Sequence, residues 1–242
     1  MLIGMRSQLS AMANNGMRAS SSSKIPLSNI IAWWSFDESD DSTRLDNSPN
    51  GLSVTPSGSQ THGAGKIENC AILNGGYFTR SGDGLPDITG DFSIAAWINI
   101  TSQAGLLARG IVGKNNGITN QYLLYQRISS TKLALNVGTL LQLNSDTSLN
   151  TDQWYFVVAI WNSATNEAKL YINNALDSSD TTELTISTVS TNFNIGSYNS
   201  SALNVFDGKI DEMALFNVVL SADQINMLYN STFGVSFGEA IA

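Results

Sequence analysis

Apolar and polar residues alternate along many short stretches of the chain. In residues 92–98 the apolar side chains recur at every second position, which places one set on the same face of an extended strand: Phe92, Ile94, Ala96 and Ile98. Residues 153–160 are apolar almost throughout, which is typical of a strand buried on both faces. Similar patterns predict further strands at 30–36, 111–114, 122–125, 133–137, 169–172 and 210–216.

One helix is predicted, after the last of these strands. Ser221 and Gln224 have the spacing of a capping box, and Leu220 and Ile225 flank the cap as a hydrophobic staple. Apolar residues continue along one helical face to Tyr229. Many short strands separated by turns, with a single short C-terminal helix, predict an all-β antiparallel β-sandwich and exclude an α/β fold.

The chain divides into three parts by composition. Residues 29–230 carry the strand pattern, and residues 231–242 form a short, mildly apolar tail. Residues 1–28 resemble an arm, because scattered apolar residues lead into a serine run at 20–23 that is typical of a linker. Two interpretations of the arm stay open: it is a disordered tail, or it becomes ordered on a partner chain.

Composition limits the classes of partner. The net charge of −8 and the lack of a basic stripe argue against nucleic acid binding. Polar residues interrupt the first apolar stretch, so no standard secretory signal and no membrane insertion are expected. Cys70 is the only cysteine, so the fold uses no intrachain disulfide.

An ordered series of motifs resembles the laminin-G-like, concanavalin A-like jelly-roll family. The motifs are Trp-x-Phe-Asp at 34–37, Asp-x-Ser-x-Asn-Gly at 46–51, the phenylalanine-to-tryptophan strand at 92–97, and Phe-x-Gly-x-Ile-Asp-Glu at 206–212 followed by Leu-Ser-x-x-x-Ile at 220–225. The resemblance covers about residues 30–230 and implies a two-sheet jelly-roll β-sandwich. The chain departs from the family where Asn173-Asn174 stands in place of the usual Asp-Gly, and where Asn162 stands in place of a frequent Asp.

The residues needed for catalysis are not evident in this sequence. His62 is the only histidine, so a Ser-His-Asp triad or a histidine metal site is not expected. The Glu-x-Asp-x-x-Glu pattern of related jelly-roll glycosidases does not occur, although glycoside hydrolysis needs two positioned carboxyl groups. We therefore expect no catalytic residues and no enzymatic activity.

The resemblance implies a calcium site, the one cofactor we expect. Relatives often carry calcium where the first and last strands are neighbours, which points to Asp37 and Asp211 and, with less support, to Asp46 and Asn50. The alternative is that Asp37 and Asp211 accept backbone N–H hydrogen bonds and fix the junction between the sheets.

A carbohydrate site needs an exposed aromatic ring beside amide or hydroxyl groups. The candidates are Trp33, Trp161 with Asn162, and Tyr198 with Asn199. The alternative for each aromatic residue is packing in the core or at a strand end.

These observations predict a non-enzymatic protein for surface recognition or assembly. An arm in front of a lectin-like sandwich resembles structural proteins of phage virions, such as capsid decorations, head fibres and tail-associated proteins. The arm would anchor the protein to other virion chains or to sister subunits in a homo-oligomer, and the sandwich would face outward on the virion surface and contact glycans. The alternatives are a bacterial carbohydrate-binding or adhesion module at the cell surface or outside the cell and, third, a carbohydrate-active enzyme.

Overall fold

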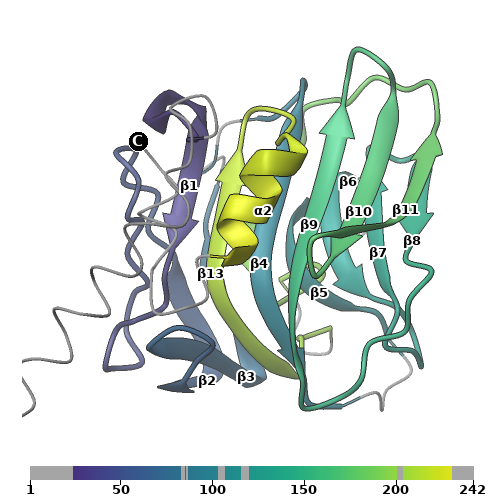
Figure 1. Ribbon diagram of the computed structural model, residues 1–242. Helices are drawn as coiled ribbons and strands as arrows, with labels where there is room; N and C mark the ends of the chain where they lie inside the picture. Colours follow the sequence, from purple (N-terminus) through teal and green to yellow (C-terminus); the bar gives the residue numbers. More distant parts are fainter. Residues whose placement is uncertain are drawn as a thin grey trace, which may run out of the picture.

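The computed structural model describes residues 24–230 except for 83–84, 86, 103–106, 116–119 and 201–203. A short 3-10 helix, η1 (Leu27–Asn29), precedes the strands (Figure 1). The strands are β1 (Ile30–Trp34), β2 (Thr55–Ala64), β3 (Asn69–Arg80), β4 (Phe92–Ile100), β5 (Arg109–Asn115), β6 (Asn120–Gln126), β7 (Leu133–Val137), β8 (Leu141–Asn144), β9 (Trp154–Asn162), β10 (Glu167–Ile172), β11 (Ala175–Thr181), β12 (Phe193–Ile195) and β13 (Gly208–Phe216). Helix α2 (Ala222–Asn230) ends the described part.

The strands form two layers joined through β13. The order β11-β10-β9-β4-β13 makes one layer, with β1 also paired to β13, and β3-β12-β5-β6-β7-β8 makes the other, with β2 on β3 (Figure 1). The first residues of β13 pair with β3 as well as with β4, which connects the layers. Every ladder between these strands is antiparallel, so the predicted antiparallel jelly-roll sandwich with one short C-terminal helix is confirmed.

Aromatic rings from distant parts of the chain fill the core between the layers. Trp34 of β1 stacks on Phe193 of β12 with ring centroids 5.5 Å apart, and Phe92 of β4 contacts Tyr122 of β6 at 5.4 Å. All four rings are buried in one hydrophobic cluster. Burial of such large apolar surfaces is the main force that holds the layers together.

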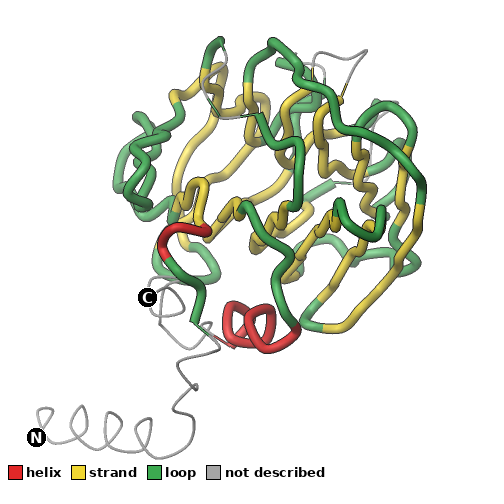
Figure 2. Tube along the Cα trace, turned by 90° about the horizontal axis from the view of Figure 1, so that it is seen from above, coloured by secondary structure: helices red, strands yellow, loops and turns green. Residues whose placement is uncertain are grey.

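Helix α2 covers the outer face of the β13–β4 layer. Figure 2 shows it outside the strands, and its residues Ile225 and Leu228 are buried against Trp97 and Phe156. The predicted capping box is present, because the Ser221 N–H donates to the Gln224 side chain at 2.9 Å and the Gln224 N–H donates to Ser221 Oγ at 3.3 Å. In the described part, no helix is long and apolar enough to cross a membrane.

The packed domain begins before the predicted boundary at residue 29. Ile25 is fully buried in the cluster beneath α2, so the last residues of the predicted arm belong to the sandwich. The rest of the arm, residues 1–23, and the tail, residues 231–242, lie outside the described residues.

Candidate functional site

One row of paired residues crosses the outward side of the β3–β8 layer. Each residue lies opposite the next in the strand register, from β3 to β8: Thr79, Asn194, Gly113, Leu123, Asn136 and Gln142. The chain neighbours of these residues, such as Phe193 and Leu135, point into the core between the layers. Because successive side chains of a strand face opposite ways, the row points away from the core between the layers. Its central residues Gly113, Leu123, Asn136 and Asn194 are nonetheless buried. We call these six residues the amide row.

Two tyrosines lie beside the amide row. The rings of Tyr125 and Tyr198 meet edge to face, with centroids 5.3 Å apart and an interplanar angle of 82°. The segment after β12 carries Tyr198, and its carbonyl accepts a hydrogen bond of 2.9 Å from the Asn115 side chain. Burial raises the pKa of Tyr125 to about 12 and also raises the pKa of Tyr198, so both hydroxyls stay neutral at physiological pH.

Three buried amide atoms near these tyrosines have no hydrogen-bond partner among the described residues: Asn136 Oδ1, Asn194 Nδ2 and Asn199 Oδ1. The other amide atom of Asn194 is held, because its Oδ1 accepts a 2.9 Å hydrogen bond from Ser200 Oγ. A buried polar atom that lacks a partner costs about 1–3 kcal/mol. Ordered water commonly pairs buried amide atoms of this kind.

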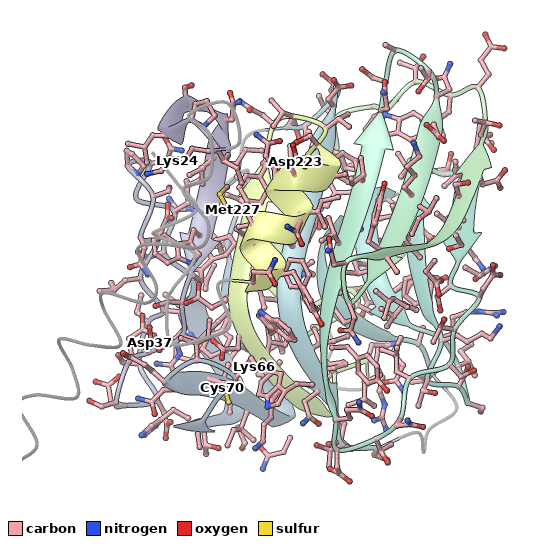
Figure 3. The ribbon with its side chains drawn as sticks, in the orientation of Figure 1. Lys24, Asp37, Lys66, Cys70, Asp223 and Met227 are labelled. Atoms are coloured by element: carbon pink, nitrogen blue, oxygen red, sulfur yellow. The ribbon has the colours of Figure 1, made fainter. Side chains whose placement is uncertain are left out.

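A second polar cluster lies where the first and last strands approach the turn between β2 and β3. Asp211 of β13 is fully buried, and its Oδ2 accepts the N–H groups of Lys66 at 2.8 Å and Ile67 at 2.9 Å. Asp37 Oδ1 accepts the Asn69 N–H at 3.2 Å. Figure 3 shows Asp37 and Lys66 at the same end of the molecule. Burial raises the pKa of Asp211 to about 7, with a smaller contribution from the charge of Asp37, so the two carboxyl groups influence each other.

The comparisons with known proteins assign the family. Residues 74–226 match the family model described as the concanavalin A-like lectin/glucanases superfamily. The chain belongs to this superfamily. A search of curated protein sequences gave no match.

Solved structures share the concanavalin A-like fold at low sequence identity. Domain 4 of AbnA, a GH43 extracellular arabinanase from Geobacillus stearothermophilus, in complex with arabinotriose, has a TM-score of 0.62 and 22% identity over 83% of this chain and 98% of that one. The binding domain of botulinum neurotoxin DC in complex with SialylT has a TM-score of 0.63 and 18% identity over 85% of this chain and 52% of that one. This chain therefore spans about half the length of the neurotoxin binding domain. Both likenesses show the fold alone.

The predicted sugar-binding residues do not come together in this lectin-like sandwich. The prediction for Trp161 is wrong, because only 1% of its surface is exposed and it packs in the core between the layers. Asn162 holds the turn after β9, where its Oδ1 accepts the N–H groups of Ala164 at 3.0 Å and Thr165 at 3.2 Å. Trp33 is half-buried and packs against the cluster beneath α2, and its indole Nε1 donates to Glu212 Oε2 at 2.8 Å. Of the predicted residues, Tyr198 and Asn199 lie near the amide row.

The four predicted calcium ligands separate into two places. Asp46 accepts hydrogen bonds from the N–H groups of Trp33 at 2.9 Å and Leu52 at 2.7 Å, and Asn50 donates to the carbonyls of Ile30 and Ile31 at 2.9 Å. These two residues fasten their loop to β1. Asp37 and Asp211 remain together as predicted, and both accept backbone N–H groups, as the alternative interpretation expected.

Calcium binding stays a prediction. Among the described residues, no group of three or more histidine, cysteine, aspartate or glutamate side chains is placed to hold a metal ion. A calcium ion at Asp37 and Asp211 would therefore take its remaining oxygen ligands from backbone carbonyls, amides or water, all of which calcium accepts.

Sequence reasoning missed Tyr125, Asn136 and Asn194 as site residues. The signal was present in the alternation of strands β6 and β7, because residues on either side of Leu124 and Leu135 must face away from the core. What the sequence did not contain was the register that brings these outward positions beside one another.

Proposed function

We propose that this lectin-like chain is a non-enzymatic recognition module that binds glycans at the amide row. The observation that carries the proposal is the set of unpartnered amide atoms on Asn136, Asn194 and Asn199 next to the Tyr125–Tyr198 pair. Sugar hydroxyl groups can pair with amide oxygens and nitrogens, and the apolar C–H face of a sugar ring can pack on a tyrosine ring.

The chemistry of the row supports binding without catalysis. None of the six residues of the amide row has a carboxyl or imidazole group. Glycoside hydrolysis needs an acid together with a base or nucleophile at the bond that breaks. The arabinotriose and SialylT complexes of the two fold relatives are consistent with this use of the fold.

Glycan affinity of a tyrosine variant tests the proposal. Tyr198→Ala removes the half-buried ring beside the amide row, and Tyr171→Ala removes a half-buried tyrosine from β10 in the other layer as the matched control. We expect a glycan array to find ligands for the wild type, and calorimetry to show a loss of about tenfold or more in Y198A, equivalent to roughly 1.4 kcal/mol. Equal affinities in both variants, or no ligand on the array, would contradict glycan binding at this face.

We extend the proposal to where the module acts. Residues 1–23 with the packed Ile25 would connect the sandwich to other chains on a virion surface or to sister subunits, so that the amide row faces outward toward host or environmental glycans. The serine-rich composition before Lys24 supports a connecting arm. The alternative remains a bacterial adhesion module at the cell surface or outside the cell.

Light scattering of the full chain and of a chain that begins at Lys24 tests the arm. We expect the full chain to form a homo-oligomer and the shortened chain to be a folded monomer, because residue 25 already belongs to the packed domain. Identical monomers would contradict the anchoring role and favour a free-standing carbohydrate-binding module.

A further inference from the structure

A hollow lined by small residues lies at the end of β7. Its volume is about 290 Å³, and it is bounded by the start of β6, the turn between β7 and β8, and the segment between β11 and β12. The residues that line it are Asn120, Gly138, Thr139, Thr185, Ser187, Thr188, Val189 and Ser190. Six of these carry a hydroxyl or amide group, so the wall offers hydrogen-bond donors and acceptors on several sides.

The strand ladder connects this hollow to the amide row. The Gly138 N–H donates to the Gln121 carbonyl at 3.0 Å, which extends the pairing of β6 with β7 by one step. Gly138 is two residues beyond Asn136 along the chain, whereas the hollow shares no residue with the row. The hollow is therefore a separate place from the amide row, connected to it through strand β7.

A hydrogen-bond network centred on Asp87 fixes one wall of the hollow. Asp87 Oδ1 accepts from Lys114 Nζ at 2.6 Å and from Gln121 Nε2 at 3.0 Å, and the Asp87 carboxylate also accepts the Val189 N–H. Lys114 and Gln121 are fully buried. A wall that is already ordered loses little conformational entropy when a ligand binds. A ligand that makes only weak polar contacts with the wall therefore binds more tightly.

The charge of this wall is balanced. The hydrogen bond from Lys114 lowers the pKa of Asp87, so the carboxylate stays ionised and neutralises the buried ammonium group. Of the lining residues in the described part of the chain, none is charged and none is aromatic. A charged ligand would lose its hydration without meeting a counter-charge, and a flat aromatic ligand would find no ring on which to stack.

We propose that this hollow binds one neutral sugar ring. Its volume is at the small end for ligand pockets, which start at roughly 300 Å³, so it suits a single monosaccharide unit rather than a longer chain. Lining hydroxyls and amides match the hydroxyl groups of a neutral sugar. This inference rests on the proposed glycan-binding function and adds to it a second subsite and the class of sugar that the subsite accepts.

Saturation-transfer NMR with single sugars tests this subsite. The probes are the neutral methyl arabinofuranoside and methyl galactoside, the acidic glucuronic acid and the basic glucosamine. Thr139→Trp and Ser190→Trp each fill the hollow from an exposed position, and Thr181→Trp makes the same change at the exposed end of β11, outside the hollow. Melting temperatures of the three variants confirm that each remains folded.

We expect the wild type and T181W to bind at least one neutral glycoside and both hollow-filling variants to lose the signal. Binding of the charged sugars alone, or neutral binding that persists in T139W and S190W, overturns the proposal. Y198A separates this outcome from the general function. An array glycan whose binding depends on Tyr198, together with no single-sugar signal, would leave glycan binding intact and overturn the neutral-sugar subsite.

Discussion

Asp37 and Asp211 hold the same turn from opposite ends of the chain. Asp37 accepts the Asn69 N–H at 3.2 Å, and Asp211 accepts the Lys66 N–H at 2.8 Å. The turn between β2 and β3 is thereby fixed both to the segment after β1 and to β13. Because Asp211 is fully buried and one of its oxygens has no partner among the described residues, this junction depends on the protonation state of Asp211.

The free energy of unfolding should fall as the pH rises toward 7. The pKa of Asp211 is raised from 3.8 to about 7, so the folded state holds this proton more tightly than the unfolded state. This stabilisation is complete at a pH below the pKa of Asp211 in the unfolded state. It is lost as the pH rises through the pKa of Asp211 in the folded state, by up to about 1.4 kcal/mol per pH unit. We expect urea unfolding to show a flatter profile between these pH values for Asp211→Asn. The exposed Asp180→Asn serves as the control and should keep the wild-type profile.

Calcium should stabilise the protein if it binds at this junction. We expect calcium to raise the Tm of the wild type at pH 8, where both carboxyl groups are ionised, and to have no such effect in Asp37→Asn or Asp211→Asn. Asp46→Asn should keep the calcium effect, because that side chain fastens a different loop. An equal rise in Tm for D211N would argue against this assignment.

The Trp33–Glu212 contact should stabilise the pairing of β1 with β13. The indole Nε1 of Trp33 donates to Glu212 Oε2 at 2.8 Å, and Glu212 is fully buried. Trp33→Phe removes this donor from a buried carboxyl group, so we expect a loss of about 1.5–3 kcal/mol in chemical denaturation. Trp154→Phe, at a half-buried position of the same cluster, measures the effect of the smaller ring alone. Equal losses of unfolding free energy in the two variants would show that the Trp33–Glu212 hydrogen bond does not contribute to stability.

The Lys114–Asp87 pair should contribute more than the Lys169–Glu167 pair, because the Lys114 ammonium group is fully buried. Lys114→Met removes a buried ammonium group from Asp87, whose side chain is 32% exposed and stays solvated, so we expect a loss of about 1.5–3 kcal/mol for the charged hydrogen bond. Lys169→Met breaks the half-exposed pair with Glu167 and should cost less than about 1 kcal/mol. Thermal unfolding of both variants measures the difference. A similar loss in the two would show that the network does not hold the wall of the hollow.

The strands that form the core were predictable because each carries its own pattern. Phe92 and Ile94 recur at strand spacing and are buried as expected, and the capping box at Ser221 is a local arrangement that requires no distant partner. The short strand β8 was not predicted, although Leu141 and Leu143 belong to the core. β2 and β11 were not predicted either. Their residues are mostly polar and exposed, and they become strands because the backbones of β3 and β10 offer hydrogen-bond partners.

Trp161 shows why the sequence did not locate the site. Strand β9 is covered on both faces, by the core between the layers and by the cluster beneath α2. An aromatic residue in its apolar run is therefore buried on whichever face it lies. The sequence by itself determined the sandwich, its helix and the ordered motifs of the family. Tertiary structure alone decided that Asn194 and Asn136 face the same side near Tyr125, because strand register sets which residues become neighbours, and a shift of one residue would turn them inward.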